Sequence, residues 1–174
     1  MTSCKSNEGS GASSHHLSDG SSSFPRNQEP VMTVLPCVHF DELELVVSDD
    51  QYMFWKGQPF TGIAVEFFPD GTLQSEVPHV NGIRHGLVRA WHPSGQLRKE
   101  SNLWYGGLHG YRREWDEQGH LVAEVLGELG IAIAEKRWDE QGRLIKDWHI
   151  SPTDNLYSTL QICRKKWGQS APPL

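Results

Sequence analysis

The stretch that decides the fold is Trp91-His92-Pro93-Ser94-Gly95-Gln96-Leu97, and it occurs in four related copies. In each copy an aromatic residue stands four positions before a glycine, and a leucine stands two positions after it. The other copies contain Gly71, Gly119 and Gly142, so successive turn glycines are 24, 24 and 23 residues apart. A sequence repeat with this period predicts supersecondary units that stack on one another.

Each copy has strand-like segments on both sides of its turn, which predicts a β-hairpin. Two registers are open for that hairpin. A two-residue loop at Ser94-Gly95 places basic residues opposite acidic ones: Arg89 with Glu100, Arg113 with Glu124, and Lys136 with Asp147. A three-residue loop that includes Pro93 places aromatic residues opposite leucines: Phe67 with Leu73, Trp91 with Leu97, Trp115 with Leu121, and Trp138 with Leu144.

We predict the three-residue loop. Proline at the first turn position and Gly95 at a left-handed position fit a type I turn closed by a glycine bulge. An exposed ion pair contributes about 0–1 kcal/mol, whereas burial of an aromatic or leucine side chain contributes about 1.5–3 kcal/mol. One sheet face should therefore carry the aromatic residues and leucines side by side.

A second kind of turn joins one hairpin to the next. Asn81-Gly82 is a strong hairpin signal; Gly106-Gly107 occupies the same place in the next copy, and Lys56-Gly57 precedes it. The predicted fold is mainly β: an elongated, twisted antiparallel β-meander of stacked hairpin repeats over residues 33–149. It begins with strands near residues 42–47 and 52–55, which we expect to be the first hairpin of the same sheet.

Both ends of the chain differ from the repeats. Residues 1–32 are rich in serine and glycine and are predicted to be a disordered tail. Residues 150–168 are predicted to form a helix with Ser151 as its N-cap and an apolar stripe that contains Leu160 and Trp167. We expect this helix to cap the sheet, with partner binding as the alternative, and residues 169–174 to be a flexible end.

Composition narrows the function classes. The chain has 16 Lys and Arg against 22 Asp and Glu, a net charge of −6, which argues against binding nucleic acid through a basic surface. No apolar run approaches the roughly 18 residues that a membrane-spanning helix needs. Three cysteines far apart do not suggest a disulfide framework. With no secretory signal recognisable, we expect a cytoplasmic protein.

No residue cluster suggests catalysis, and no cofactor or metal is expected. His85 and His109 stand at the same position of two successive copies, just before a second glycine. Equivalent positions lie one hairpin apart, roughly 9–10 Å, which is too far for one ion to hold both. An acidic residue follows each turn glycine by five positions and is expected to be solvated or salt-bridged; these residues are Glu76, Glu100, Glu124 and Asp147.

The repeats resemble a known family. Asn81–Gly86, then Trp91, then Pro93–Leu97 look like a MORN-type repeat. More narrowly, Trp55–Gly62 is similar to the first repeat of the bacterial MORN-variant group labelled YwqK-family antitoxin components. The resemblance covers about 45–148. It implies an antiparallel β-ribbon used for protein contacts, which in bacteria often means neutralising a toxin and in eukaryotes is linked to membranes and scaffolding.

We therefore expect a non-enzymatic protein-binding module, an antitoxin or immunity protein that neutralises a toxin. Its acidic balance suits a basic partner. The alternative is a MORN-type membrane-associated scaffold, which the acidic charge disfavours. The candidate partner-binding residues are Arg89, Trp91, Arg113, Trp115, Lys136 and Trp138. The basic members could instead pack within the sheet through cation–π contacts. The sequence defines no oligomeric state.

Overall fold

Four turns with the same hydrogen bonds organise the fold, which a computed structural model describes for residues 35–46 and 52–174. In the second turn the His92 N–H donates to the Gln96 carbonyl at 2.8 Å, and the Gly95 N–H donates to the His92 carbonyl at 2.8 Å. Gly95 has a φ of 81°, a left-handed conformation that glycine adopts without steric cost. The predicted three-residue turn is confirmed.

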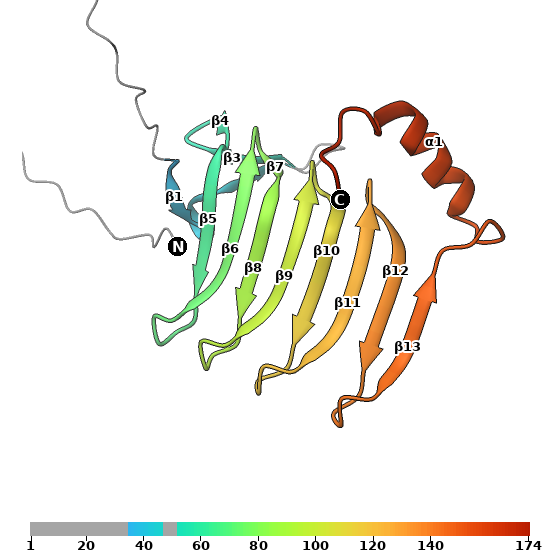
Figure 1. Cartoon of the computed structure of the whole chain (residues 1–174). Helices are drawn as coiled ribbons and strands as arrows, with labels where there is room; N and C mark the ends of the chain where they lie inside the picture. The colour runs from blue at the N-terminus through green and yellow to red at the C-terminus, as the bar shows by residue number, and fades with distance from the viewer. Residues whose placement is uncertain (1–34, 47–51) are drawn as a thin grey trace, which may run out of the picture. The chain divides into compact units, whose positions relative to one another are not determined.

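These turns connect the strands of one large sheet, in which consecutive hairpins lie side by side (Figure 1). Its antiparallel strands are β5 (Gly62–Phe67), β6 (Leu73–Val80), β8 (Gly86–Trp91), β9 (Leu97–Trp104), β10 (Gly107–Trp115), β11 (Leu121–Glu128), β12 (Ile131–Trp138) and β13 (Leu144–His149). They follow one another in chain order across the sheet, and the short β7 (Ile83–Arg84) pairs with β6. The predicted mainly β fold, an antiparallel meander of hairpin repeats followed by one helix, is confirmed.

The first strands do not continue this meander. β1 (Cys37–His39) pairs in parallel with β5, and the 3-10 helix η1 (Phe40–Glu42) follows it. The strands β2 (Glu44–Val46), β3 (Tyr52–Trp55) and β4 (Gln58–Pro59) form a separate three-stranded sheet. The predicted pairing of the first two strand segments is confirmed, but their place as the first hairpin of the main sheet is wrong.

Backbone hydrogen bonds at Gly82 explain this departure. The Gly82 N–H donates to the Phe60 carbonyl at 2.7 Å, and the Gly82 carbonyl accepts from the Met53 N–H at 2.9 Å. β3 therefore meets the main sheet at the turn after β6 rather than along a strand. Phe60 and Met53 are thereby buried, and they form the main apolar cluster with Val38 and Ala64.

The outer turns, which join one hairpin to the next, have two residues each with positive φ. Asn81-Gly82 was recognisable from the sequence, but the expected turn at Gly106-Gly107 is wrong by one residue. Gly107 pairs with Trp104, so the loop consists of Tyr105 and Gly106, with φ values of 45° and 83°. A third turn of this kind lies at 129–130.

Each outer turn is tied to the preceding repeat by a side chain located 20 residues earlier. The Asn81 N–H donates to Thr61 Oγ1 at 2.9 Å. In the next repeat the Tyr105 N–H donates to His85 Nδ1 at 3.4 Å. The Leu129 N–H donates to Nδ1 of the equivalent His109 at 3.1 Å. The repeated histidines therefore have a structural role, in which an unprotonated ring nitrogen accepts a backbone hydrogen bond.

The C-terminal helix α1 spans Tyr157–Trp167 and begins later than predicted. Ser151 is not its N-cap, because the Ser151 N–H donates to Asp154 Oδ2 at 2.6 Å and the Ser151 carbonyl accepts from the Asp154 N–H, which closes a separate turn. Two hydrogen bonds from Arg164 to Glu128, 2.6 and 2.7 Å long, join α1 to the end of β11.

Two other predictions concern the N-terminal tail and membrane-spanning helices. The predicted tail at residues 1–32 lies outside the described residues. Within the described part, no helix has both the length and the apolar character needed to cross a membrane.

Candidate functional site

Both candidate hairpin registers are present in each repeat, because a β-bulge lies between them. In the second hairpin Trp91 pairs with Leu97, whereas one residue earlier Ala90 pairs with Lys99. Arg98 is therefore the extra residue of β9, and beyond it Arg89 lies opposite Glu100. The aromatic–leucine pairing that we predicted is confirmed, and the exclusion of the ion-pair register is wrong.

The bulge decides which residues share a face. In a regular strand Leu97 and Glu100, three positions apart, would point to opposite faces. Because residues directly opposite each other project to the same face, pairing with Trp91 and with Arg89 puts both on one face. We call this the tryptophan face, since it carries Trp91, Trp115 and Trp138.

One row of alternating charge crosses the tryptophan face from β6 to β13. Each member lies directly opposite the next on the neighbouring strand. The row consists of Glu76, Arg89, Glu100, Arg113, Glu124, Lys136 and Asp147. From the sequence we expected solvated or salt-bridged acids and, in the preferred register, a separate basic row; the structure brings them into a single line.

Arg113 shows how the row is held. Its Nε lies 2.7 Å from Glu124 Oε2, and its guanidinium carbon lies 4.5 Å from the centre of the Tyr111 ring. The matching Arg89 Nε lies 3.0 Å from Glu100 Oε2. The arginine side chains remain about two-fifths exposed, at 38% and 42%. These observations are consistent with both interpretations of the basic residues, since the two arginines pack within the sheet and also expose charge to solvent.

The aromatic residues form a second row beside the charged one, next to the inner turns, which are the four turns within the hairpins that contain Gly71, Gly95, Gly119 and Gly142. Each is paired with a leucine: Phe67 with Leu73, Trp91 with Leu97, Trp115 with Leu121, and Trp138 with Leu144. The two ends of the row are open, with Phe67 44% exposed and Leu144 49% exposed. The three tryptophans between them are partly buried.

The opposite face of the same strands has a different composition. Small buried residues, Ala90, Ser101 and Ala123, lie on it. Its charged residues form their own ion pairs, including Lys99 with Glu114 at 3.3 Å. The tryptophan face therefore differs from the opposite face in its continuous aromatic row.

All six predicted partner-binding residues lie on the tryptophan face. Three belong to the charged row and three to the aromatic row beside it. The sequence offered Glu100 and Glu124 as partners of the basic residues only in the register that we set aside, so we did not expect these acids between the basic residues on the same surface. A signal was available in the sequence, because in all four copies an acid follows a leucine by three positions. Residues at this odd spacing can lie on the same face of a strand only if a bulge lies between them.

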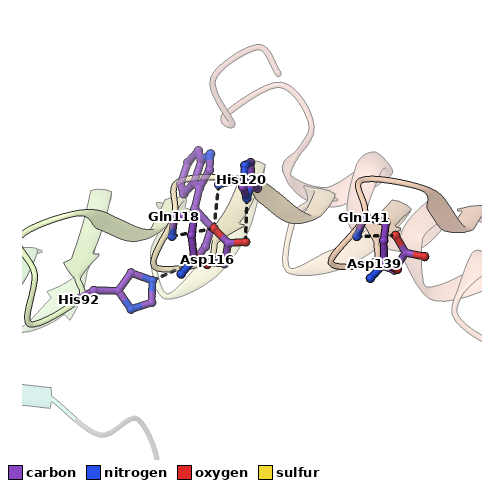
Figure 2. A network of polar contacts seen from close by, with 7 residues as sticks. His92, Asp116, Gln118, His120, Asp139 and Gln141 are labelled. Atoms are coloured by element: carbon purple, nitrogen blue, oxygen red, sulfur yellow. Dashed lines mark hydrogen bonds and ion pairs between the residues drawn. The ribbon is translucent and has the colours of Figure 1, made fainter.

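The inner turns hold a further set of polar contacts, and Figure 2 shows the third and fourth of these turns. Asp116 Oδ1 accepts hydrogen bonds from the N–H groups of Gln118 and His120 at 3.0 and 2.8 Å. From the second turn, His92 Nε2 donates to the Trp115 carbonyl at 2.9 Å. These contacts fix each turn and join it to the next hairpin.

Asp139 repeats this arrangement, accepting at Oδ1 from the N–H groups of Gln141 and Arg143. The hydrogen bond from the Arg143 N–H is the main reason that the pKa of the Asp139 carboxyl lies below its usual value. An acid held in its charged form by turn amides is suited to fixing a loop rather than to moving protons. Among residues 35–46 and 52–174 no three His, Cys, Asp or Glu side chains are grouped to hold a metal ion.

These features define a β-hairpin repeat scaffold with one aromatic and charge-striped face. In sequence comparison, residues 60–81 and 84–104 match the MORN repeat variant family. Those two segments cover β5 to β9, so the chain contains a MORN repeat module, and modules of this kind are typically protein-binding scaffolds. No curated protein matches the chain.

Proposed function

We propose that the chain is a non-enzymatic protein-binding module that acts in the cytoplasm and binds a protein partner through the tryptophan face. The observation that carries this proposal is the pairing of two parallel rows, one aromatic and one of alternating charge, on one face of the MORN repeat sheet. Tryptophan, tyrosine and arginine are the residues most enriched at binding hot spots.

The aromatic row and the charged row contribute to binding in different ways. The partly exposed tryptophans offer apolar area that a partner could cover at low cost in side-chain entropy. The charged row offers a fixed sequence of signs, which discriminates partners through complementarity more than it adds affinity. A net charge of −6 favours a basic partner through electrostatic steering.

Within this proposal, the narrower role is that of an antitoxin or immunity protein whose partner is a toxin. It is motivated by the resemblance of Trp55–Gly62 to the first repeat of antitoxin components. Co-expression with the products of neighbouring genes tests it directly. Rescue of cell growth by the chain from an otherwise lethal neighbour supports the role, and failure to rescue from every neighbouring product contradicts it.

The binding surface can be tested independently of the partner's identity. The full chain and two single variants, Trp115→Ala and Trp148→Ala, are immobilised and exposed to an extract of the native host. Trp148 is a matched control, since it is also partly exposed but lies on the opposite face, opposite Glu135. We expect one protein retained by the wild type and by Trp148→Ala but lost with Trp115→Ala. Equal retention by both variants would contradict the proposed surface.

A further inference from the structure

A second surface lies at the outer turns, at the other end of the strands from the aromatic row. An open groove of about 350 Å³ is lined by Trp104, Tyr105, Gly107, Leu129 and Trp167. Tyr105 is 54% exposed and Trp167 is 41% exposed. The rings of Trp104 and Tyr105 meet edge to face, with their centres 5.3 Å apart. Three aromatic side chains around one cavity form an apolar groove of ligand-binding size.

The groove is held in shape by contacts from three parts of the chain. The Tyr105 ring meets the His85 ring edge to face at 4.8 Å, which orients it above its turn. The Leu129 N–H donates to His109 Nδ1 and fixes the opposite wall. Trp167 comes from α1, which the Arg164–Glu128 pair attaches to the sheet. The aromatic walls are therefore positioned by the fold.

The chain's own C-terminal segment lies beside this groove. His109 Nε2 donates a hydrogen bond of 2.7 Å to the Pro172 carbonyl. Because Nδ1 of the same ring accepts from Leu129, His109 is the tautomer with its proton on Nε2. The His109 ring also meets the Trp104 ring, with centres 6.2 Å apart. A proline carbonyl is thus bound by a buried donor next to an aromatic wall.

This combination is the chemistry by which proteins recognise proline-rich segments. Proline rings stack on aromatic side chains, and their carbonyls accept hydrogen bonds from a fixed donor, while the stiff polyproline II conformation keeps the entropy cost low. His109 contacts the C-terminal segment Ala171-Pro172-Pro173-Leu174 through the Pro172 carbonyl, and this segment contains two prolines.

We propose that the groove binds a proline-rich segment of a partner protein in the polyproline II conformation, and that Pro172 and Pro173 are a resident competitor for it. The partner's prolines pack on Tyr105, Trp104 and Trp167, and His109 transfers its hydrogen bond from the Pro172 carbonyl to a carbonyl of the partner. This site lies at the outer turns, at the other end of the strands from the aromatic row, and its test does not depend on the outcome for that row.

The test uses fluorescence anisotropy with two labelled peptides, a decaproline and a Gly-Ser peptide of the same length. We expect the full chain to bind decaproline at least tenfold more tightly than the Gly-Ser peptide. Replacing the competitor in the full chain, by Pro172→Ala with Pro173→Ala, should tighten decaproline binding at least threefold. Equal affinity for both peptides, or no tightening in the double variant, overturns the proposal.

Two wall variants locate the binding. Tyr105→Ala and Trp167→Ala remove exposed rings, so the sheet should still fold, and each should weaken decaproline binding at least tenfold. Phe67→Ala, an equally exposed aromatic residue of the tryptophan face, is the control and should leave it unchanged. Unchanged binding in both wall variants overturns the site. Light scattering measures the oligomeric state of the wild type and of Trp167→Ala in parallel. If the wild type is a dimer and the variant is a monomer, the groove binds a second copy of the chain, and the proposal is overturned.

Discussion

Arg113 lies directly opposite Glu124 on β11, with its Nε 2.7 Å from the carboxylate, although the same hairpin also pairs Trp115 with Leu121. The two pairings are compatible because Val122 is an extra residue in β11. The charged row contains six successive cross-strand pairings, so each arginine of the row has an acid opposite it on both neighbouring strands.

The Arg113–Glu124 pair should contribute modestly to stability. Both side chains are partly exposed, at 38% and 24%, so solvent screens the interaction. We expect a double-mutant cycle of Arg113→Ala and Glu124→Ala to give a coupling free energy of about 0.5–1 kcal/mol in urea unfolding. Arg113→Ala alone should also lose the contact with Tyr111. A coupling energy of zero would mean that the charged row serves binding alone.

Gly110 should be intolerant of a side chain. Its φ is 103°, and a Cβ placed there would lie 3.2 Å from the Cβ of Asn102. We expect Gly110→Ala to lower the free energy of unfolding by about 2 kcal/mol or more. Gly142→Ala is the matched control, because Gly142 also has positive φ but open space around it. The control should cost about 1 kcal/mol; equal losses would show that crowding at Gly110 has no effect.

The bond between Glu128 and Arg164 should set the acid sensitivity of the helix. Hydrogen bonding to Arg164 is the main reason that the pKa of Glu128 lies below its usual value of 4.5. A carboxyl with a lowered folded-state pKa contributes stability above its unfolded pKa, and that contribution is lost as the pH falls below 4.5.

Glu128→Gln should remove this contribution at neutral pH. We expect a loss of about 1 kcal/mol at pH 7 in urea unfolding, together with greater solvent exposure of Trp167 seen as a red shift in fluorescence. Between pH 5 and pH 3 the variant should lose less stability than the wild type. Glu140→Gln, an exposed residue of an inner turn, should behave as the wild type. A pH profile unchanged by Glu128→Gln would rule out the role of this pair.

His79 should make the N-terminal cluster sensitive to mild acid. The side chain is 1% exposed, its Nδ1 donates to the Val77 carbonyl at 2.8 Å, and its Nε2 is buried with no hydrogen-bond partner. Burial is the main reason that its pKa lies below the usual 6.5. The unfolded chain therefore binds the proton more readily, and stability falls as the pH drops below 6.5.

A comparison with His79→Gln isolates this effect from the other histidines. Wild-type unfolding free energy should decrease from pH 7.5 to pH 5.5 by more than that of the variant, because only the wild type has to desolvate an imidazolium at this position. The measurement is urea unfolding at both pH values. An equal decrease in the two proteins would show that His79 does not titrate differently on folding.

Local features were predictable from the sequence, and long-range ones were not. The inner turns depend on one left-handed glycine such as Gly95 within a short window, so their loop length and pairing could be read directly. The outer turn at Tyr105 could not, because a tyrosine with a φ of 45° gives no turn signal and is held there by the His85 contact.

In the candidate site, too, local features were predictable from the sequence and long-range ones were not. The six predicted residues share a face because the two on each strand are two positions apart, with no bulge between them. The acids of the charged row depend on the extra residue in the following strand, which only strand pairing reveals. The start of α1 was mispredicted because Ser151 and Asp154 have the residue types of a helix cap but form an isolated turn. The groove depends on residues from three separate segments and has no sequence signature.

The central claim is that a protein partner covers the tryptophan face. Hydroxyl-radical footprinting of the full chain, alone and with the partner isolated by the immobilised chain, tests it most directly because tryptophan oxidation is read residue by residue. The account predicts that the partner lowers oxidation of Trp91, Trp115 and Trp138 and leaves Trp148 unchanged. Protection of Trp148 with full oxidation of the other three would contradict it.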